Sequence, residues 1–295
     1  MTVRASVVIA CRNGAAYLEE TLEGVVSQAW TEPWEVVFAD NGSTDDSRAI
    51  FRQVAARNPA IPMRSVDASA RPGKSFALNC AVAASQGRSI IVCDADDVPA
   101  PGWLAAMGGA LETHDFVSAR AEAKELNRSP CGIYRHVAES TWVLGFAPYA
   151  LCTAGATMGF SRALFDAVGG FSTEVQPEDD DFCIRAHLAG YRLQTVPEAV
   201  VHYRLRTDLG SIYRQAFQYS LTHVQNAKRY RPLGPRPARP WRIISREAYD
   251  VARALAKQQL RPKGPETEAK LRWRLGWLAG QVAGIVRFRT PPTMA

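Results

Sequence analysis

The chain lacks several patterns that would place it in a common class of protein. Its 295 residues contain no apolar run close to the about 18 residues that a membrane span needs. The first residues lead into a strand-like run without the cleavage pattern of a signal peptide. The six cysteines form no CxxC pair and lie mostly among apolar neighbours. We therefore expect reduced core cysteines in a cytoplasmic protein.

Two common phosphate-binding patterns are also missing. The segment CRNGAAYLEE, residues 11–20, follows the first strand-like run and holds neither GxGxxG nor GxxxxGK[ST]. This excludes a dinucleotide fingerprint and a P-loop at that turn. If the protein binds a nucleotide, its phosphates must be neutralised in another way.

The charge of the chain is unevenly distributed. Residues 1–202 hold 16 basic and 24 acidic side chains, a formal charge of −8, whereas residues 203–295 hold 19 basic and five acidic ones, a formal charge of +14. The proline-rich segment 231–240 is predicted to be an extended linker, because proline resists helix and disfavours it in the preceding residue. We expect an acidic body, residues 1–205, followed by a basic and mostly helical extension, residues 206–295.

The N-terminal half alternates strand-like runs with helical patterns. The strand-like runs are at 3–14, 34–40, 61–67 and 88–94, and the helical segments are at 15–28, 43–57 and 73–87. Most of the runs are continuously apolar, which predicts an α/β fold with a mostly parallel, Rossmann-like sheet flanked by helices. Ligands of such sheets bind outside the carboxyl ends of the strands, where Asn13, Asp40 and Asp94 are expected.

The fourth strand-like run ends in three carboxylates. Ile90 to Cys93 is apolar, and Asp94, Asp96 and Asp97 follow at once. Carboxylate oxygens suit Mg²⁺ or Mn²⁺, and either ion could bridge these side chains to a diphosphate. Taken alone the pattern is short, and a solvated acidic loop would explain it equally well.

Five segments together carry a family resemblance. They are VVIACRNGAAYLEETLEGVVSQ, EVVFADNGSTDDS, GKSFALNCAVAASQGRSIIVCDADD, TAGATMGFSRALFDAVGGF and PEDDDFCIRAHLAGYRL, in this order within residues 4–205. The chain resembles the inverting family-2 glycosyltransferases, which have the GT-A fold. One departure is visible: the family usually has an acidic pair at the end of the second strand, where this chain has Asp40 and Asn41.

The resemblance implies a nucleotide-sugar donor site. Asp40 would accept a hydrogen bond from the base, Asp94 would contact the ribose, and Arg71 and Lys74 would contact the nucleotide or its diphosphate. The alternatives are a carboxylate favoured by a helix start for Asp40 and a solvated side chain for Lys74. A UDP-sugar is the first expectation for the donor, with GDP- and dTDP-sugars as alternatives.

The resemblance also implies a metal site. Asp96 would be the main ligand of Mn²⁺ or Mg²⁺, and Asp97 would support it or shape the loop. His202, after a later strand-like run, would be a further contact to the metal or the diphosphate, the alternative being a structural histidine.

The acidic run 178–181 is the expected catalytic segment. Four adjacent carboxylates repel one another, which raises some of their pKa values. Matching the run to the family pattern assigns the general base to Asp179, with Glu178 orienting the acceptor and Asp181 bracing the helix. The chain is thus expected to move a sugar from a nucleotide donor to an acceptor hydroxyl. A sugar nucleotidyltransferase and a non-catalytic sugar-nucleotide or glycan-binding module are the alternatives.

The acceptor and the extension are less well defined by the sequence. A glycan, a small molecule and a lipid-linked sugar all remain possible acceptors, and Trp142 and Tyr149 are candidates to stack on a sugar ring. Two helices are predicted, at 241–260 and 266–288. Basic and aromatic residues in 266–289 suit either the cytoplasmic face of an anionic membrane or packing on the acidic body. No nucleic-acid-binding motif accompanies the charge, so nucleic acid is not an expected partner.

Overall fold

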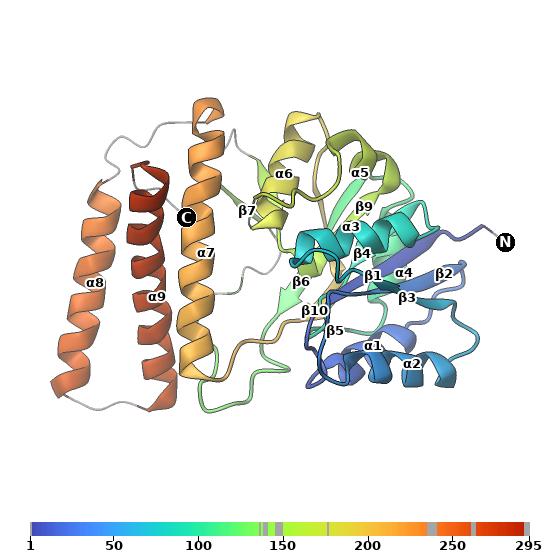
Figure 1. The fold of residues 1–295 in the computed structure, drawn as a ribbon, viewed down its shortest axis with the longest axis horizontal. Coiled ribbons are helices and arrows are strands. Elements are labelled where there is room, and N and C mark those ends of the chain that lie inside the picture. Colours follow the sequence, from blue (N-terminus) through green and yellow to red (C-terminus); the bar gives the residue numbers. More distant parts are fainter. Residues whose placement is uncertain are drawn as a thin grey trace.

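The body of the molecule is a single twisted sheet with helices on both faces (Figure 1). The computed structural model describes residues 2–135, 137, 141–144, 150–175, 177–234, 241–260 and 264–291. Within these residues the sheet has eight strands in the order β3-β2-β1-β4-β9-β6-β10-β5. The strands are β1 Ala5–Cys11, β2 Trp34–Asp40, β3 Met63–Asp67, β4 Ser89–Val92, β5 Val98–Pro99, β6 Phe116–Glu122, β9 Met158–Ser161 and β10 Gln194–His202. A separate pair is formed by β7 Thr141–Val143 and β8 Leu151–Thr153.

The sheet is mostly parallel, as the sequence predicts. β1 pairs in parallel with β2 and β4, β2 with β3, and β6 with β10. The short strand β9 runs antiparallel between β4 and β6, and β5 runs antiparallel to β10. The first four strands lie within the predicted runs. The antiparallel insertions were not predicted.

Two helical layers cover the sheet because its strands are apolar on both sides. Helices α1 Leu18–Val26, α2 Ser47–Arg57 and α4 Trp103–Ala110 cover one face, and α3 Lys74–Ala84, α5 Arg162–Val168 and α6 Glu178–Leu188 cover the other. In β2, Val36 and Phe38 pack under the first layer while Val37 and Ala39 pack under the second. All four side chains are buried, which explains why this strand reads as a continuous apolar run.

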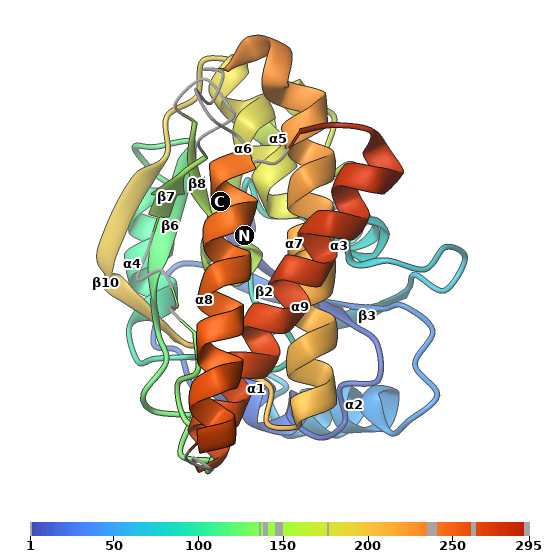
Figure 2. The same ribbon diagram turned by 90° about the vertical axis from the view of Figure 1, so that its left-hand side faces the viewer.

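Three C-terminal helices stand side by side next to the body, with α9 between α7 and α8 (Figures 1 and 2). They are α7 Leu209–Tyr230, α8 Trp241–Leu260 and α9 Pro265–Phe288. The predicted helices at 241–260 and 266–288 are confirmed, but α7 was not predicted. Tyr230 of α7 donates a hydrogen bond to buried Asp181 of α6 at 2.6 Å, and Ala227 joins the same apolar core. The extension therefore shares a core with the sheet, and a division of the chain at residue 205 stays a prediction.

The predicted extended linker is wrong at its beginning. Arg231–Leu233 forms a short 3₁₀ turn that continues α7. The turn follows the last residue of α7 directly, so the helix continues into the proline-rich segment before it stops. The remaining linker residues from 235 to 240 lie outside the described residues, as does Tyr149.

Glycines set the distance between α7 and α9. Gly276, Gly280 and Gly284 recur every four residues on one side of α9. A Cβ atom added to Gly280 would overlap with the carbonyl oxygen of Phe217. The two backbones therefore approach more closely than any larger residue permits. None of the helices in the described part of the chain combines the length and the apolar character that crossing a bilayer requires.

The variant Gly280→Ala is expected to lower the free energy of unfolding by about 1–3 kcal/mol, as overpacked cores typically do. The added methyl group meets a backbone atom of α7, which cannot move without displacing the whole helix. Urea denaturation followed by circular dichroism measures the change. Gly109→Ala is the matched control, because position 109 is an exposed helical glycine with open space around it. Equal stability of the two variants would show that α9 can move away from α7 at little cost.

Candidate functional site

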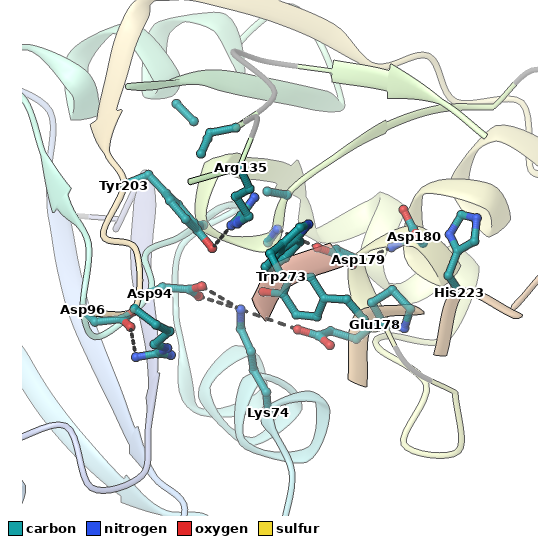
Figure 3. Close-up of a pocket in the computed structure, with 18 of the residues that line it drawn as sticks. Lys74, Asp94, Asp96, Arg135, Glu178, Asp179, Asp180, Tyr203, His223 and Trp273 are labelled. Atoms are coloured by element: carbon teal, nitrogen blue, oxygen red, sulfur yellow. Dashed lines mark hydrogen bonds and ion pairs between the residues drawn. The ribbon is translucent and has the colours of Figure 1, made fainter. Parts of the chain in front are cut away.

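A cavity of about 1100 Å³ lies at the carboxyl ends of β1 and β4 and extends to the C-terminal helices (Figure 3). Residues from several separate segments line it, and four groups among them carry most of its polar and aromatic side chains. They come from the β1–α1 turn (Asn13, Gly14, Tyr17), the loop after β4 (Asp94, Asp96), the start of α6 (Glu178, Asp179, Asp180) and the helical extension (Tyr219, His223, Glu247, Asp250, Trp273, Trp277). The strand-end position follows from the parallel sheet, whose carboxyl ends meet at one edge.

Three carboxylates gather in the loop after β4. Oxygens of Asp94, Asp96 and Asp97 all lie within 4.8 Å of one another. Asp97 Oδ1 accepts a hydrogen bond from the backbone N–H of Arg204 at 2.8 Å. Its Oδ2 is buried and has no hydrogen-bond partner within the described residues. Burial, together with the neighbouring carboxylates, raises the pKa of Asp97 well above its usual range. The loop thus concentrates negative charge that a cation would stabilise.

Two cations already contact this cluster. Lys74 Nζ lies 2.7 Å from Asp94 Oδ1, and Arg206 Nη1 lies 3.1 Å from Asp96 Oδ2. Burial and the nearby Asp94 raise the pKa of Asp96, although Arg206 and Lys74 work against the rise. An all-oxygen set with one unpartnered buried oxygen fits Mg²⁺ or Mn²⁺ in its chemistry.

Lys74 connects the acidic loop to α6. Its ammonium group also lies 3.5 Å from Glu178 Oε1. Burial opposes the charge of Lys74, but Asp94 and Glu178 outweigh it and raise the pKa of the lysine well above its usual range. Gly155 leaves room for this contact, since a Cβ there would lie 3.1 Å from Lys74 Nζ. The side chain is therefore charged and held between two walls of the cavity (Figure 3).

Asp179 lies at the start of α6 and lines the cavity. Its Oδ2 accepts from the N–H of Gly155 at 3.2 Å, and its Oδ1 accepts from the N–H of Asp180 at 2.9 Å. Burial and the adjacent Glu178 raise the pKa of Asp179 to about 6, against the opposing effect of Lys74. The shift is larger than the sequence suggested, yet the group is still mostly ionised at neutral pH.

The other two carboxylates of the run have structural partners. Asp180 is buried and accepts a hydrogen bond from Trp142 Nε1 at 3.3 Å. Asp181 is fully buried, pairs with Arg185 Nε at 2.7 Å and accepts from the Tyr230 hydroxyl. Asp181 therefore braces α6, in line with the role expected for it, and also attaches α6 to α7, which was not predicted. Repulsion within the run persists at Asp180, because burial and the neighbouring carboxylates raise its pKa well above its usual range.

Three predicted site residues lie outside the cavity lining of the described structure. Asp40 is buried against Arg48, whose Nη2 lies 2.5 Å from its Oδ2. Arg71 is exposed. His202 Nδ1 lies 3.1 Å from Glu122 Oε2. Their roles toward a base, a nucleotide and a metal stay predictions.

Asn41 has a clear structural task in the loop before α3. Its amide nitrogen donates to the carbonyl of Arg71 at 2.8 Å, and its amide oxygen accepts from the N–H of Gly73, also at 2.8 Å. An ionised carboxylate could accept but not donate. The departure from the usual acidic pair therefore secures the segment that leads to Lys74.

Sequence reasoning missed the wall contributed by the helical extension. Arg206 follows β10 closely, so its nearness in sequence to the candidate His202 was an available signal. Trp273 and Trp277 are four residues apart and therefore share one side of α9. Their spacing is a visible signal, but in the sequence it suits a membrane interface or packing on the acidic body, and neither reading predicts a cavity wall. In the structure both indoles line the cavity.

The model of "Glycosyl transferase family 2" matches residues 6–163, which is more than half of the chain. The chain belongs to this family. A second model, "Glycosyl transferase family group 2", matches residues 89–280 and so includes much of the helical extension. The predicted family is confirmed.

Relatives of this family-2 glycosyltransferase match it to different extents. An uncharacterized glycosyltransferase, YwdF of Bacillus subtilis, is 26% identical over 273 residues, which cover 88% of this chain and 95% of the relative. Further curated relatives are matched over only 35–52% of their own length. The activities of those longer proteins are therefore not assigned to this chain.

Solved structures confirm the GT-A fold. The mannosyltransferase PcManGT from Pyrobaculum calidifontis, in complex with GDP-Man and Mn²⁺, aligns with a TM-score of 0.67 and 23% identity over 97% of this chain and 88% of its own. Staphylococcus aureus TarS 1–349, in complex with UDP-GlcNAc, aligns with a TM-score of 0.52 and 16% identity over 98% and 93%. Both alignments include the C-terminal helices, since they span nearly the whole chain.

Proposed function

We propose that this family-2 glycosyltransferase is a metal-dependent, inverting hexosyltransferase. One observation carries the proposal: a cluster of three carboxylates and a separate carboxylate, Asp179, belong to one cavity, and Lys74 bridges Asp94 of the cluster to Glu178 beside Asp179. Sugar transfer needs both chemistries, charge neutralisation at the leaving group and a base at the acceptor. A binding module would need neither.

The donor is proposed to be a nucleotide diphosphate sugar. The complexes of PcManGT with GDP-Man and of TarS with UDP-GlcNAc support this class without selecting a nucleotide. We retain a UDP-sugar as the first choice, with GDP- and dTDP-sugars as alternatives. Asp40, Arg71 and Asp94 are proposed to contact the nucleotide. Lys74 and Arg206 supply positive charge where the diphosphate would lie.

Asp96 is proposed as the main metal ligand, with Asp94 and Asp97 beside it and His202 as a further contact. The Mn²⁺ in the PcManGT complex supports the use of a divalent metal, and the clustered oxygens of Asp94, Asp96 and Asp97 support its place. A bound Mn²⁺ or Mg²⁺ would neutralise the charge that develops on the leaving diphosphate. Asp97 would hold the loop in place through its hydrogen bond from Arg204.

The chain's own residues then account for the transfer step. Asp179 takes the proton of an acceptor hydroxyl, and the oxygen attacks the anomeric carbon from the side opposite the diphosphate. A bond forms between that oxygen and the carbon while the bond to the diphosphate breaks, and the diphosphate leaves with the electron pair. In-line attack gives a product of opposite anomeric configuration. Glu178, next to the base, is proposed to orient the acceptor.

A donor screen tests the proposal. Purified protein is incubated with UDP-, GDP- and dTDP-sugars in the presence of Mn²⁺ or Mg²⁺, and release of the nucleotide diphosphate is measured. We expect release from one donor class, suppressed by EDTA and restored by added metal. Thermal stabilisation by UDP without metal, and without donor hydrolysis, would support a binding module instead. Formation of pyrophosphate from a nucleoside triphosphate and a sugar phosphate would indicate a nucleotidyltransferase.

Transfer is expected to slow as the pH falls through about 6, because Asp179 accepts a proton only when it is ionised. Below that pH the ionised fraction falls about tenfold per pH unit. Burial and Glu178 raise the pKa of Asp179, while Lys74 and the hydrogen bond from the backbone N–H of Asp180 limit that rise. The profile of kcat/KM for the acceptor between pH 5 and 8 reports this group in the free enzyme. A profile that stays flat down to pH 5 would contradict the assignment.

We propose cytoplasmic localisation with peripheral attachment through 266–289, which would bring a lipid-linked acceptor near the cavity. Val282 and Val286 of α9 are exposed, and Arg287 adjoins them. Flotation with anionic vesicles is expected for the whole chain and to weaken at high salt. The double variant Val286→Glu, Arg287→Glu should stay in the soluble fraction. Leu188→Glu, at an exposed apolar position on α6, is the control. Flotation unaffected by the double variant would leave α9 as a packed structural helix.

A further inference from the structure

The few acidic residues of the basic extension differ in their surroundings: some have local partners, and others line the cavity. Residues 203–295 contain only five. Asp208 caps α7 by accepting from the N–H of Ser211, Glu266 pairs with Lys270, and Glu268 pairs with Arg272. The remaining two, Glu247 and Asp250 of α8, both line the cavity. In a segment of formal charge +14, these two carboxylates place negative charge at the cavity wall.

Glu247 carries an unsatisfied acceptor. Its Oε1 accepts from Gln281 Nε2 at 3.5 Å, while its Oε2 is buried and has no hydrogen-bond partner within the described residues. An oxygen taken out of water without a donor is costly. Burial also raises the pKa of Glu247 to about 7; a hydrogen bond from the Trp277 side chain opposes the rise and the charge of Asp250 adds to it. A ligand that brings a hydrogen-bond donor to this wall would remove the cost.

Aromatic rings line the same cavity as the two carboxylates. The rings of Trp273 and Trp277 have centroids 6.2 Å apart, and the ring of His223 lies 6.2 Å from that of Trp277. Trp142 lines the same cavity from β7. Flat apolar faces beside hydrogen-bond acceptors suit a ligand with an apolar face and hydroxyl groups around its rim. A pyranose ring has both.

The cavity also has room for two ligands. Ligand sites are typically about 300–1,000 Å³, and this one is about 1100 Å³. Asp94 and Asp96 lie on one side of Lys74, and Asp179 and His223 lie on the other (Figure 3). A donor held at the acidic loop would therefore leave the wall of α7, α8 and α9 for the second substrate, with the base nearby.

We infer that this helical wall is the acceptor subsite and that it takes a neutral saccharide, whose ring stacks on Trp273 or Trp277 and whose hydroxyls donate to Glu247 and Asp250. The inference rests on the proposed glycosyltransferase activity. A phosphorylated or carboxylated sugar would meet these carboxylates and be repelled.

Arg274 and Arg135 also line the cavity. Arg274 is exposed, as Asp250 is, so solvent screens both charges. The Arg135 guanidinium lies 5.0 Å from the Trp273 ring centroid and donates to the Tyr203 hydroxyl at 2.8 Å, so it already has aromatic partners.

The test uses the whole chain with its donor and metal at fixed concentrations. Methyl glycosides of glucose, galactose, mannose and N-acetylglucosamine are compared with methyl glucuronide and mannose 6-phosphate as acceptors. We expect at least one neutral glycoside to raise nucleotide release above the rate of donor hydrolysis, and the charged sugars to have no effect. Stimulation by charged sugars alone, or by none of the panel, would overturn the inference.

Variants then locate the subsite. Glu247→Gln and the exposed Asp250→Asn are expected to raise KM for the stimulating glycoside by about 10- to 100-fold, the effect of losing a hydrogen bond to a charged group. Their Kd for the nucleotide diphosphate, measured by calorimetry, should match the wild type. Glu268→Gln, on the same extension but away from the cavity, is the control. An unchanged KM in both α8 variants would overturn the assignment of the subsite.

Different results contradict the proposed function and the acceptor subsite. If the wild-type chain neither binds a nucleotide sugar nor releases its nucleotide with metal, the proposed function is wrong. If it hydrolyses a donor in water but no neutral glycoside stimulates release, only the acceptor subsite is wrong. Circular dichroism of Glu247→Gln checks that the loss of a buried charge has not unfolded α8.

Discussion

The variant Asp96→Asn is expected to abolish metal-dependent nucleotide release while the fold survives. Asp96 lies in the loop between β4 and β5, and its carboxylate contacts Arg206 rather than the core. An amide keeps the shape of the side chain but loses the negative charge that a hard divalent ion requires. Release should fall to the level seen with EDTA, and the melting temperature should remain close to that of the wild type.

Two comparisons give this prediction its specificity. Asp166→Asn makes the same chemical change at an exposed position on α5 and should leave release unaltered. Titration with Mn²⁺ distinguishes weak binding from no binding, since excess metal would restore a merely weakened site. Release by Asp96→Asn at the wild-type rate, at the wild-type metal concentration, would reject Asp96 as the main ligand.

For Asp179→Asn we expect transfer to fall by about 10²–10⁴-fold, the usual contribution of a general base. An amide cannot accept the acceptor's proton. The side chain lines the cavity and is held by N–H groups of Gly155 and Asp180. Binding of the nucleotide sugar depends on the acidic loop and Lys74, so its Kd should change little. The acidic limb of the pH profile should also disappear.

Asp181→Asn is the informative companion. Asp181 is fully buried between Arg185 and Tyr230, and removing its charge leaves the arginine without its partner. We expect a lower melting temperature but nearly normal turnover per folded molecule. If instead Asp181→Asn lost transfer and Asp179→Asn kept it, the assignment of roles within 178–181 would be displaced by two residues.

Much of the sheet could be predicted because its signals are local. β1, β2 and β4 are continuous apolar runs that end in turn or acidic residues, and burial on both faces is the reason for that composition. β9 is only four residues long and pairs antiparallel with two strands distant in sequence. Nothing local specifies such pairing, so its place in the sheet was not predictable.

The candidate site likewise contains residues that short sequence segments identify and residues that they do not. Asp94, Asp96, Asp97 and Asp179 stand in short segments whose residue types point to their chemistry, and they could be named from the sequence. Trp277 and Glu247 could not, since a tryptophan on a basic helix suits a membrane, a core or a cavity equally well. Which of these it meets depends on how close α9 comes to α7, and Gly280 sets that distance through contact with Phe217.

The sequence by itself determined the α/β architecture, the acidic loop after β4 and the acidic start of α6, because period, composition and charge act over a few residues. Only the tertiary structure decided that Lys74 lies between Asp94 and Glu178 and that Asp181 turns away to Tyr230. It also decided that the basic extension closes one side of the cavity. Those outcomes depend on the direction of side chains from separate elements, which packing of the whole chain selects.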